Sequence, residues 1–162
     1  MKNQYASDIL DDLPETKQEK VFTKEPVSEN VEMLLQDAKR IELELLPQLF
    51  SICKVTDYSG LDMDQPFVFT GRTDEEKSLV CPVEFVPANT VRRDDGWRAL
   101  RIRGELDFSL IGILAGISGV LAAEKIGIFA VSTYNTDYIL VKEENCGRAV
   151  ESLAKAGYRI LG

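Results

Sequence analysis

Two repeat lengths in the pattern of hydrophobic residues divide the chain into predicted strands and helices. From Ile41 the apolar side chains alternate with glutamates, which is typical of a half-buried strand. Pro47 interrupts this strand and predicts an edge position or a β-bulge, because proline cannot donate a ladder hydrogen bond. The pattern then predicts strands at 49–55, 67–70 and 78–81, a turn or one helical turn at 74–77, and a single helical turn at 83–87.

Two segments are too polar to predict a packed element. Residues 1–40 are rich in Asp, Glu, Lys and Gln, so they cannot bury enough apolar area to offset the entropy of ordering. We expect a disordered extension there, with one short helix that starts at Ser28. Residues 92–96 hold two arginines, two aspartates and a glycine, and we expect a polar loop there.

The C-terminal part is the most regular. After a predicted strand at 97–103, Ser109 can cap a helix that ends at Gly127, with an apolar face formed by Leu110, Ile113, Leu114, Ile117 and Leu121. Strands at 128–134 and 138–141 flank a tight turn, a second helix spans 146–154 and stops at Gly157, and a last strand covers 158–161. The order β-α-β-β-α-β predicts an α+β, ferredoxin-like fold: a four-stranded antiparallel sheet with both helices on one face.

Composition narrows the possible functions. The net charge is −8 and the chain has no histidine. An acidic protein is a poor binder of nucleic acid or anionic membranes, and the missing histidine removes the commonest general base and metal ligand. Ser109 and Ser132 therefore have no histidine to activate them, and no phosphate-binding glycine loop is present. We predict no catalytic residues, no metal site and no cofactor, and hence a binding module.

Cysteines and apolar runs indicate the cellular environment. The three cysteines, Cys53, Cys81 and Cys146, are far apart and odd in number, so we expect buried free thiols and a reducing cytoplasm. Residues 1–20 lack the apolar segment of a signal peptide. The longest apolar run, 110–123, is too short to span a bilayer. We expect a soluble protein.

Three segments are candidates for ligand binding. Gly112 lies near the start of the first helix, where free N–H groups favour an anion; close packing of Gly112, Gly116 and Gly119 is the alternative. In 132–138, Asp137 can hold an ammonium group and Thr133 can add a hydrogen bond, although a plain turn explains the same residues. The third is an arginine cluster, for which a solvated face with salt bridges is favoured over anion binding: Arg92, Arg93, Arg98, Arg101 and Arg103.

Two long motifs, GELDFSLIGIL and IFAVSTYNTDYILV, carry a family resemblance, and LELLPQLFSICKV and WRALRIRGEL extend it over residues 41–161. They resemble the ACT-domain proteins of the bacterial type related to the eukaryotic cytosolic arginine sensor. The resemblance implies tandem ACT-like units: a degenerate one at 41–96 and an ACT domain at 97–162. It also implies a homodimer and an amino acid or similar small molecule bound between units.

The same resemblance implies where the ligand binds. The loop that opens the first helix falls on Leu110, Ile111, Gly112 and Ile113, and the strand-end residues fall on Thr133, Tyr134 and Asp137. Backbone N–H groups near Gly112 would take the α-carboxylate, and Asp137 an ammonium or guanidinium group. The sensor has an acidic residue at the position of Leu110, so this chain is expected to prefer a neutral or smaller amino acid, or to bind none.

Two other functions are open at this stage. A structural protein could use the ACT fold only to dimerise, and it would form a stable dimer that does not respond to amino acids. RNA-recognition modules share the β-α-β-β-α-β order, but they need aromatic residues on a basic strand. The corresponding strand around Tyr138 has one aromatic residue in an acidic chain, so RNA binding is disfavoured.

Overall fold

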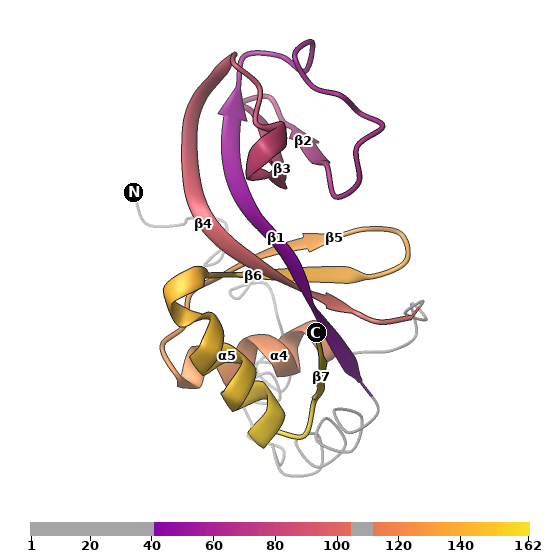
Figure 1. The fold of residues 1–162 in the computed structure, drawn as a ribbon, viewed down its shortest axis with the longest axis vertical. Coiled ribbons are helices and arrows are strands. Elements are labelled where there is room, and N and C mark those ends of the chain that lie inside the picture. Colours follow the sequence, from indigo (N-terminus) through magenta and orange to yellow (C-terminus); the bar gives the residue numbers. More distant parts are fainter. Residues whose placement is uncertain (1–40, 105–111) are drawn as a thin grey trace, which may run out of the picture. The chain divides into compact units, whose positions relative to one another are not determined.

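The computed structural model describes residues 41–104 and 112–162, which all belong to one compact unit (Figure 1). The extension at 1–40 and the predicted helix cap at Ser109 lie outside the described residues. The described elements are the strands β1 (Glu42–Val55), β2 (Phe69–Arg72), β3 (Lys77–Pro82), β4 (Thr90–Ile102), β5 (Ile128–Ser132), β6 (Asp137–Lys142) and β7 (Arg159–Leu161), the helices α4 (Ile113–Ala123) and α5 (Glu143–Lys155), and the 3-10 turn η1 (Val83–Phe85).

The described strands form one curved sheet in the order β2-β3-β1-β4-β6-β5, with β7 paired to β1 (Figure 1). β1 and β4 are the long central strands and run through both ends of the sheet. The bulge predicted at Pro47 is confirmed, because the pairing of β1 with β4 shifts register between Leu45 and Leu49. The predicted strand at 67–70 forms two residues later, with Gly71 inside β2 and paired to Ser78.

The polar loop predicted at 92–96 is wrong. These residues are part of β4, where Arg92 pairs with Lys54 and Arg93 with Cys53 of β1. Their side chains are exposed or half-buried, so no alternation of apolar residues marks the strand. Gly96, with φ of +76°, lies at a second register shift of the same ladder. The boundary proposed between 96 and 97 therefore falls inside a strand, and two separate ACT-like units remain a prediction.

The partner of the last strand also differs from the expected one. A four-stranded antiparallel ferredoxin-like sheet would place β7 beside β4. Instead β7 pairs with the start of β1 in parallel, with Glu42 opposite Arg159 and Glu44 opposite Leu161. β1 thus lies between β7 and β4, because the upstream segment supplies a strand that the C-terminal part alone does not have.

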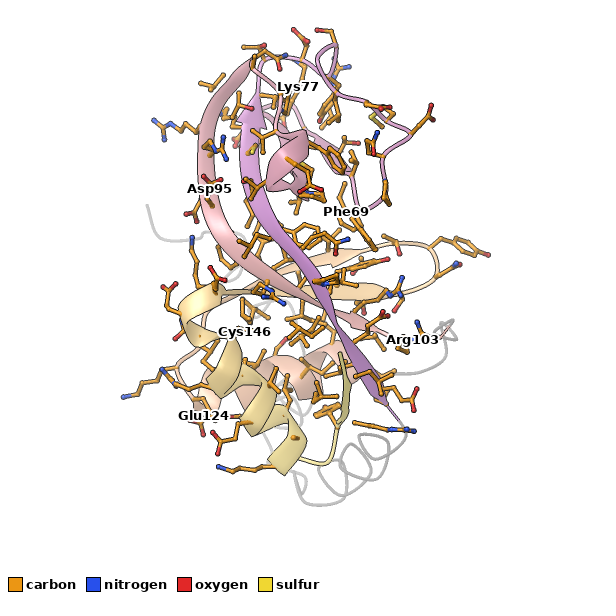
Figure 2. The ribbon with its side chains drawn as sticks, viewed as in Figure 1. Phe69, Lys77, Asp95, Arg103, Glu124 and Cys146 are labelled. Carbon is orange, nitrogen blue, oxygen red and sulfur yellow. The ribbon has the colours of Figure 1, made fainter. Side chains whose placement is uncertain are left out.

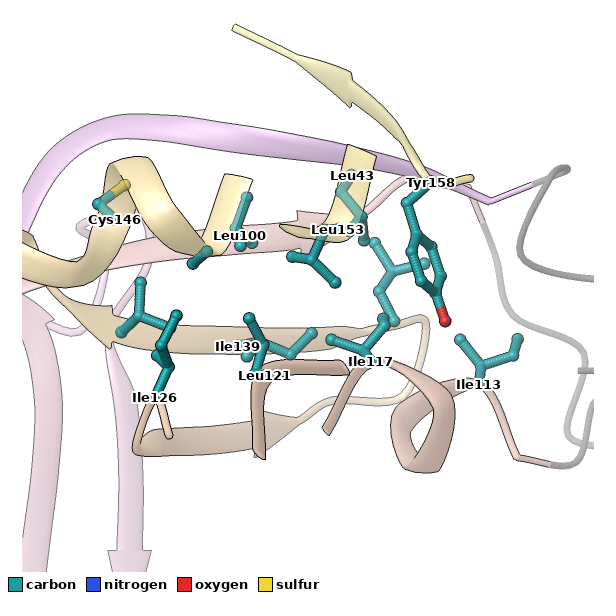
Figure 3. Packing of buried hydrophobic residues seen from close by; sticks show 13 residues of the cluster. Leu43, Leu100, Ile113, Ile117, Leu121, Ile126, Ile139, Cys146, Leu153 and Tyr158 are labelled. Carbon is teal, nitrogen blue, oxygen red and sulfur yellow. The ribbon is translucent and has the colours of Figure 1, made fainter. Parts of the chain in front are cut away.

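Both helices cover one face of the sheet, as predicted. Figure 3 shows Ile117 and Leu121 of α4 and Leu153 of α5 meeting Leu43, Leu100 and Ile139 of the strands. All six side chains are fully buried. Burial of such an aliphatic side chain contributes roughly 1.5–3 kcal/mol, so this helix face is the main source of stability for the C-terminal part.

The two helices end in the same way but with different residues. After α5, Gly157 takes a φ of +103°, and the N–H of Tyr158 donates to the carbonyl of Leu153, which confirms the predicted stop. After α4, the left-handed residue is Lys125, with φ of +58°, and not the predicted Gly127. The bond from the Ile126 N–H to the Leu121 carbonyl closes this turn.

The opposite face of the sheet carries a second, aromatic cluster. The Tyr138 ring of β6 packs against Phe69 at a centroid distance of 4.9 Å and against Phe67 at 6.4 Å. Figure 2 shows Phe69 between β2 and the β5–β6 strands. The sheet face on which an RNA-recognition module would stack bases is therefore covered at Tyr138 by the chain itself.

Candidate functional site

A cleft of about 480 Å³ opens where β4 ends beside the β5–β6 hairpin. This volume lies within the usual range for small-molecule sites, about 300–1,000 Å³. We call it the hairpin cleft, and its described lining residues are Arg101, Ile102, Arg103, Gly104, Thr133, Tyr134, Asn135, Thr136 and Tyr138.

The hairpin is fixed to the end of β4 by hydrogen bonds. The Thr133 hydroxyl donates to the carbonyl of Thr136 at 2.8 Å and accepts from its N–H at 3.3 Å, so it closes the turn. The buried Thr136 hydroxyl donates to the carbonyl of Ile102 at 2.7 Å. The side chain of Tyr134 is 83% exposed at the tip. One wall of the cleft is therefore an ordered turn rather than a free loop.

Arg101 of β4 and Arg103, which directly follows this strand, share a single carboxylate of β1. Arg101 donates to the Oε2 atom of Glu44 through Nε at 3.1 Å and Nη2 at 2.5 Å. Arg103 donates to the same oxygen through Nη1 at 3.1 Å. The hydrogen bond from Arg101 outweighs partial burial and lowers the pKa of Glu44, so Glu44 is ionised at neutral pH. The three side chains together carry one net positive charge.

Arg101 is held on several sides. Its guanidinium carbon lies 6.0 Å from the centre of the Phe67 ring, and Tyr138 is its partner on the neighbouring strand. The hydrogen bond with Glu44 raises the pKa of Arg101 further above its usual range. Its side chain is 27% exposed, against 48% for Arg103, which Figure 2 shows at the end of β4. Arg101 is thus a fixed cation and Arg103 the more accessible one.

α4 begins on the other side of the sheet. Gly112 caps it with a φ of +86°, a conformation that other residues rarely adopt, and its carbonyl accepts the first intrahelical bond, from Gly116, at 2.8 Å. The N–H groups of residues 113–115 precede this bond, so they have no intrahelical partner. The Ile113 side chain belongs to the core, which leaves only its backbone for a ligand.

Asp137 is the first residue of β6 and lies opposite Ser132. Side chains alternate along a strand, and Ile139 and Val141 belong to the core under the helices, so Asp137 is on the helix side of the sheet. Tyr138 and Arg101 are paired on the opposite face. Asp137 is half-buried and is not part of the lining of the hairpin cleft.

The structure thus separates the sequence-predicted residues into three groups. Thr133 and Tyr134 line the hairpin cleft. Gly112, Ile113 and Asp137 lie on the helix side of the sheet, and Leu110 and Ile111 lie outside the described residues. Sequence analysis described Arg101 and Arg103 only as members of a charged cluster. Their pattern could not show that both face a cleft, because the partner Glu44 lies more than fifty residues earlier in the chain.

Two further ion pairs lie along β4. Arg93 pairs with Asp95, and Lys142 with Asp94, which confirms the expected salt bridges along β4. Within residues 41–104 and 112–162, no group of His, Cys, Asp and Glu is arranged to hold a metal ion. No helix in the same ranges is long and apolar enough to span a membrane.

Comparison with known proteins assigns the C-terminal part. Residues 92–155 match the model of an ACT domain. A segment of 60 residues is 43% identical to the cytosolic arginine sensor for mTORC1 subunit 1 from Homo sapiens, and equally to that from Bos taurus. This segment is 36% of the chain but 18% of each relative, so the chain matches less than a fifth of their length.

Solved structures extend the similarity over most of the described fold. A protein from Agobacterium tumefaciens is 31% identical, with 75% of this chain and 92% of that chain covered and a TM-score of 0.66. A protein of unknown function from Vibrio cholerae, named a possible transport protein, is 21% identical over 80% and 98% of the two chains, with a TM-score of 0.59, and shares the fold. The fold, the family model and these relatives agree: the chain belongs to the ACT-domain proteins related to the cytosolic arginine sensor.

Proposed function

We propose that this protein is an amino-acid-binding regulatory module without catalytic activity. The observation that carries the proposal is that an ACT-type fold presents the free backbone donors at the start of α4 and the carboxylate of Asp137 on the same side of its sheet. The similarity to a protein named an arginine sensor supports the same ligand class.

In the proposed complex, the N–H groups that follow Gly112 hold the α-carboxylate of the ligand. They precede the first intrahelical bond and carry the positive end of the helix dipole, which favours an anion. Asp137 holds the α-ammonium group from the helix side of the sheet. Contacts of the ligand with Leu110, Ile111, Ile113, Thr133 and Tyr134 are predicted from the family resemblance alone. Since Leu110 is not acidic, arginine is not the expected ligand.

Thermal unfolding of the full chain with each of the twenty amino acids tests the proposal. A ligand present at a hundred times its Kd adds about 2.7 kcal/mol to the free energy of unfolding. For a chain of this length that corresponds to a rise in Tm of roughly 5–11 °C. Calorimetric titration would then give a Kd between ~1 μM and ~1 mM.

A matched pair of variants locates the site. Asp137→Asn removes a charge-assisted hydrogen bond, worth about 1.5–3 kcal/mol, so the ligand should bind about ten- to a hundredfold more weakly. Asp74→Asn makes the same change of charge at an exposed turn residue that has no side-chain partner within the described residues, and should leave the Kd unchanged. Flat titrations with all twenty amino acids would contradict the proposed function.

We also propose that the protein is a homodimer of the cytoplasm, supported by the cytosolic location in the name of the relatives. Light scattering tests the dimer. A stable dimer whose Tm responds to none of the amino acids would favour the purely structural role over ligand binding.

A further inference from the structure

We propose that the hairpin cleft is a carboxylate-binding site of its own, on the face of the sheet opposite the helices. This inference goes beyond the proposed function and names the ligand class: a small dicarboxylate, with aspartate and glutamate as the amino-acid candidates. It assigns Arg101 and Arg103 as the residues that select the ligand.

The charge of the cleft is the first argument. Its described lining holds two arginines and no carboxylate. Glu44, behind the cleft, neutralises one of the two charges, and a single oxygen of Glu44 accepts all three of the donated bonds. Among the described residues, one positive charge is left at the cleft, in a protein whose net charge is −8. A local cation in an acidic protein is the arrangement expected for an anionic ligand rather than for a basic one.

The unused donors are the second argument. A guanidinium group has five N–H donors in a fixed planar fork that matches a carboxylate. Arg101 uses Nε and Nη2 for Glu44, and Arg103 uses Nη1. Glu44 therefore occupies only part of each fork, and the remaining donors of Arg103 belong to a side chain that is 48% exposed. A ligand carboxylate could accept hydrogen bonds from the N–H donors of Arg103 that Glu44 does not use.

Preorganisation is the third argument. Arg101 is fixed by Glu44 and by the Phe67 ring, so it loses little side-chain freedom when a ligand binds. The hairpin wall is equally fixed, because Thr136 is bonded to the carbonyl of Ile102. The cation and one wall of this cleft of about 480 Å³ are therefore already ordered before a ligand binds.

The experiment is calorimetric titration of the full chain with L-aspartate, L-glutamate, L-asparagine, L-glutamine, L-arginine and succinate. We expect an acidic amino acid to bind at least tenfold more tightly than its amide, and arginine to bind most weakly because the cleft repels a second cation. Succinate tests whether the ammonium group is needed. Tight succinate binding without any amino-acid binding would support the cleft and contradict the proposed function.

Arginine variants test the cleft itself. Arg103→Gln should weaken binding of the acidic ligand about five- to tenfold, and Arg101→Lys by a similar factor, because lysine keeps the charge but loses the fork. Arg92→Gln is the matched control: the same strand, an exposed side chain and the same change of charge, so the Kd should change less than twofold. A Tm measured without ligand shows that each variant is folded.

Two results would overturn the inference. In the first, asparagine or glutamine binds as tightly as the corresponding acid, Asp137→Asn abolishes binding and Arg103→Gln leaves it intact. The cleft would then not select the ligand, whereas amino-acid binding itself would be supported. The other is an equal loss of binding in Arg92→Gln and Arg103→Gln, which would mean that only the overall charge matters.

Discussion

A methyl group added at Gly116 tests how closely α4 packs against the segment after α5. An ideal Cβ there would lie 2.8 Å from the Oη atom of Tyr158, closer than real side chains approach, and would meet no other heavy atom of the described residues within 4 Å. Tyr158 is 7% exposed, and Figure 3 shows its hydroxyl group directed toward α4. The rigid ring can escape the added methyl only by moving in a packed core.

The expected cost follows from two opposing effects. Overpacking of this kind costs about 1–3 kcal/mol. Replacement of a helical glycine by alanine contributes about 1 kcal/mol in the opposite direction. Gly116→Ala should therefore lower the free energy of unfolding by up to about 2 kcal/mol. Gly119→Ala, in the same helix but with open space around its Cβ, should raise it by about 1 kcal/mol.

Urea unfolding of the two variants gives the comparison, and Tyr158→Phe supplies the decisive control. The phenylalanine has no Oη atom, so Gly116→Ala in the Tyr158→Phe background should behave like Gly119→Ala. This predicts a coupling of about 1–3 kcal/mol between positions 116 and 158. Equal stabilities of the two single alanine variants, or no rescue by phenylalanine, would refute the packing argument.

Three further predictions concern charge, helix ends and thiols. Arg101 lowers the pKa of Glu44 below its usual 4.5, so the unfolded chain binds that proton more tightly. The stabilisation by Glu44 is therefore present above pH 4.5 and is lost as the pH falls through the lowered pKa of the folded state. The urea midpoints of the wild type and Glu44→Gln should accordingly converge as the pH falls below 4.5. Residues 125 and 157 both have positive φ, which glycine adopts more easily than other residues. Thermal unfolding should therefore show that Lys125→Gly raises the free energy of unfolding by up to about 1 kcal/mol and that Gly157→Ala lowers it by a similar amount. The three buried cysteines should react with a chromogenic thiol reagent at pH 8 only after unfolding, since burial raises the pKa of Cys81 to about 12; rapid reaction of the folded protein would contradict their burial.

The C-terminal elements were predictable because each has one buried face. α5 is the plainest case: its buried residues Cys146, Ala149 and Leu153 recur at helical spacing, and its charged residues all lie outside this buried face. Residues 92–96 could not be predicted in the same way. Both faces of β4 are solvated there, so strand pairing with Lys54 and Cys53 leaves no apolar pattern in the sequence.

The strand that pairs with β7 could not be predicted for a different reason. Hydrophobic periodicity predicts that 159–161 form a strand, but it carries no information on which strand lies beside it. The same limit applies to the cleft, since the pairing of Arg101 with Glu44 depends on how β1 and β4 align. The hairpin turn at Thr133 to Thr136 was predictable, because its side chains bond to their own local backbone.

The insertion of β1 between β4 and β7 has a consequence for how the chain reaches its native state. Arg159 bonds to Glu42 across 117 residues, so the sheet of the ACT domain closes only when the two most distant described strands meet. During synthesis, the start of β1 stays unpaired on its β7 side until residues 159–161 have been made. Such long-range closure slows folding and leaves this strand edge open to wrong partners in the meantime.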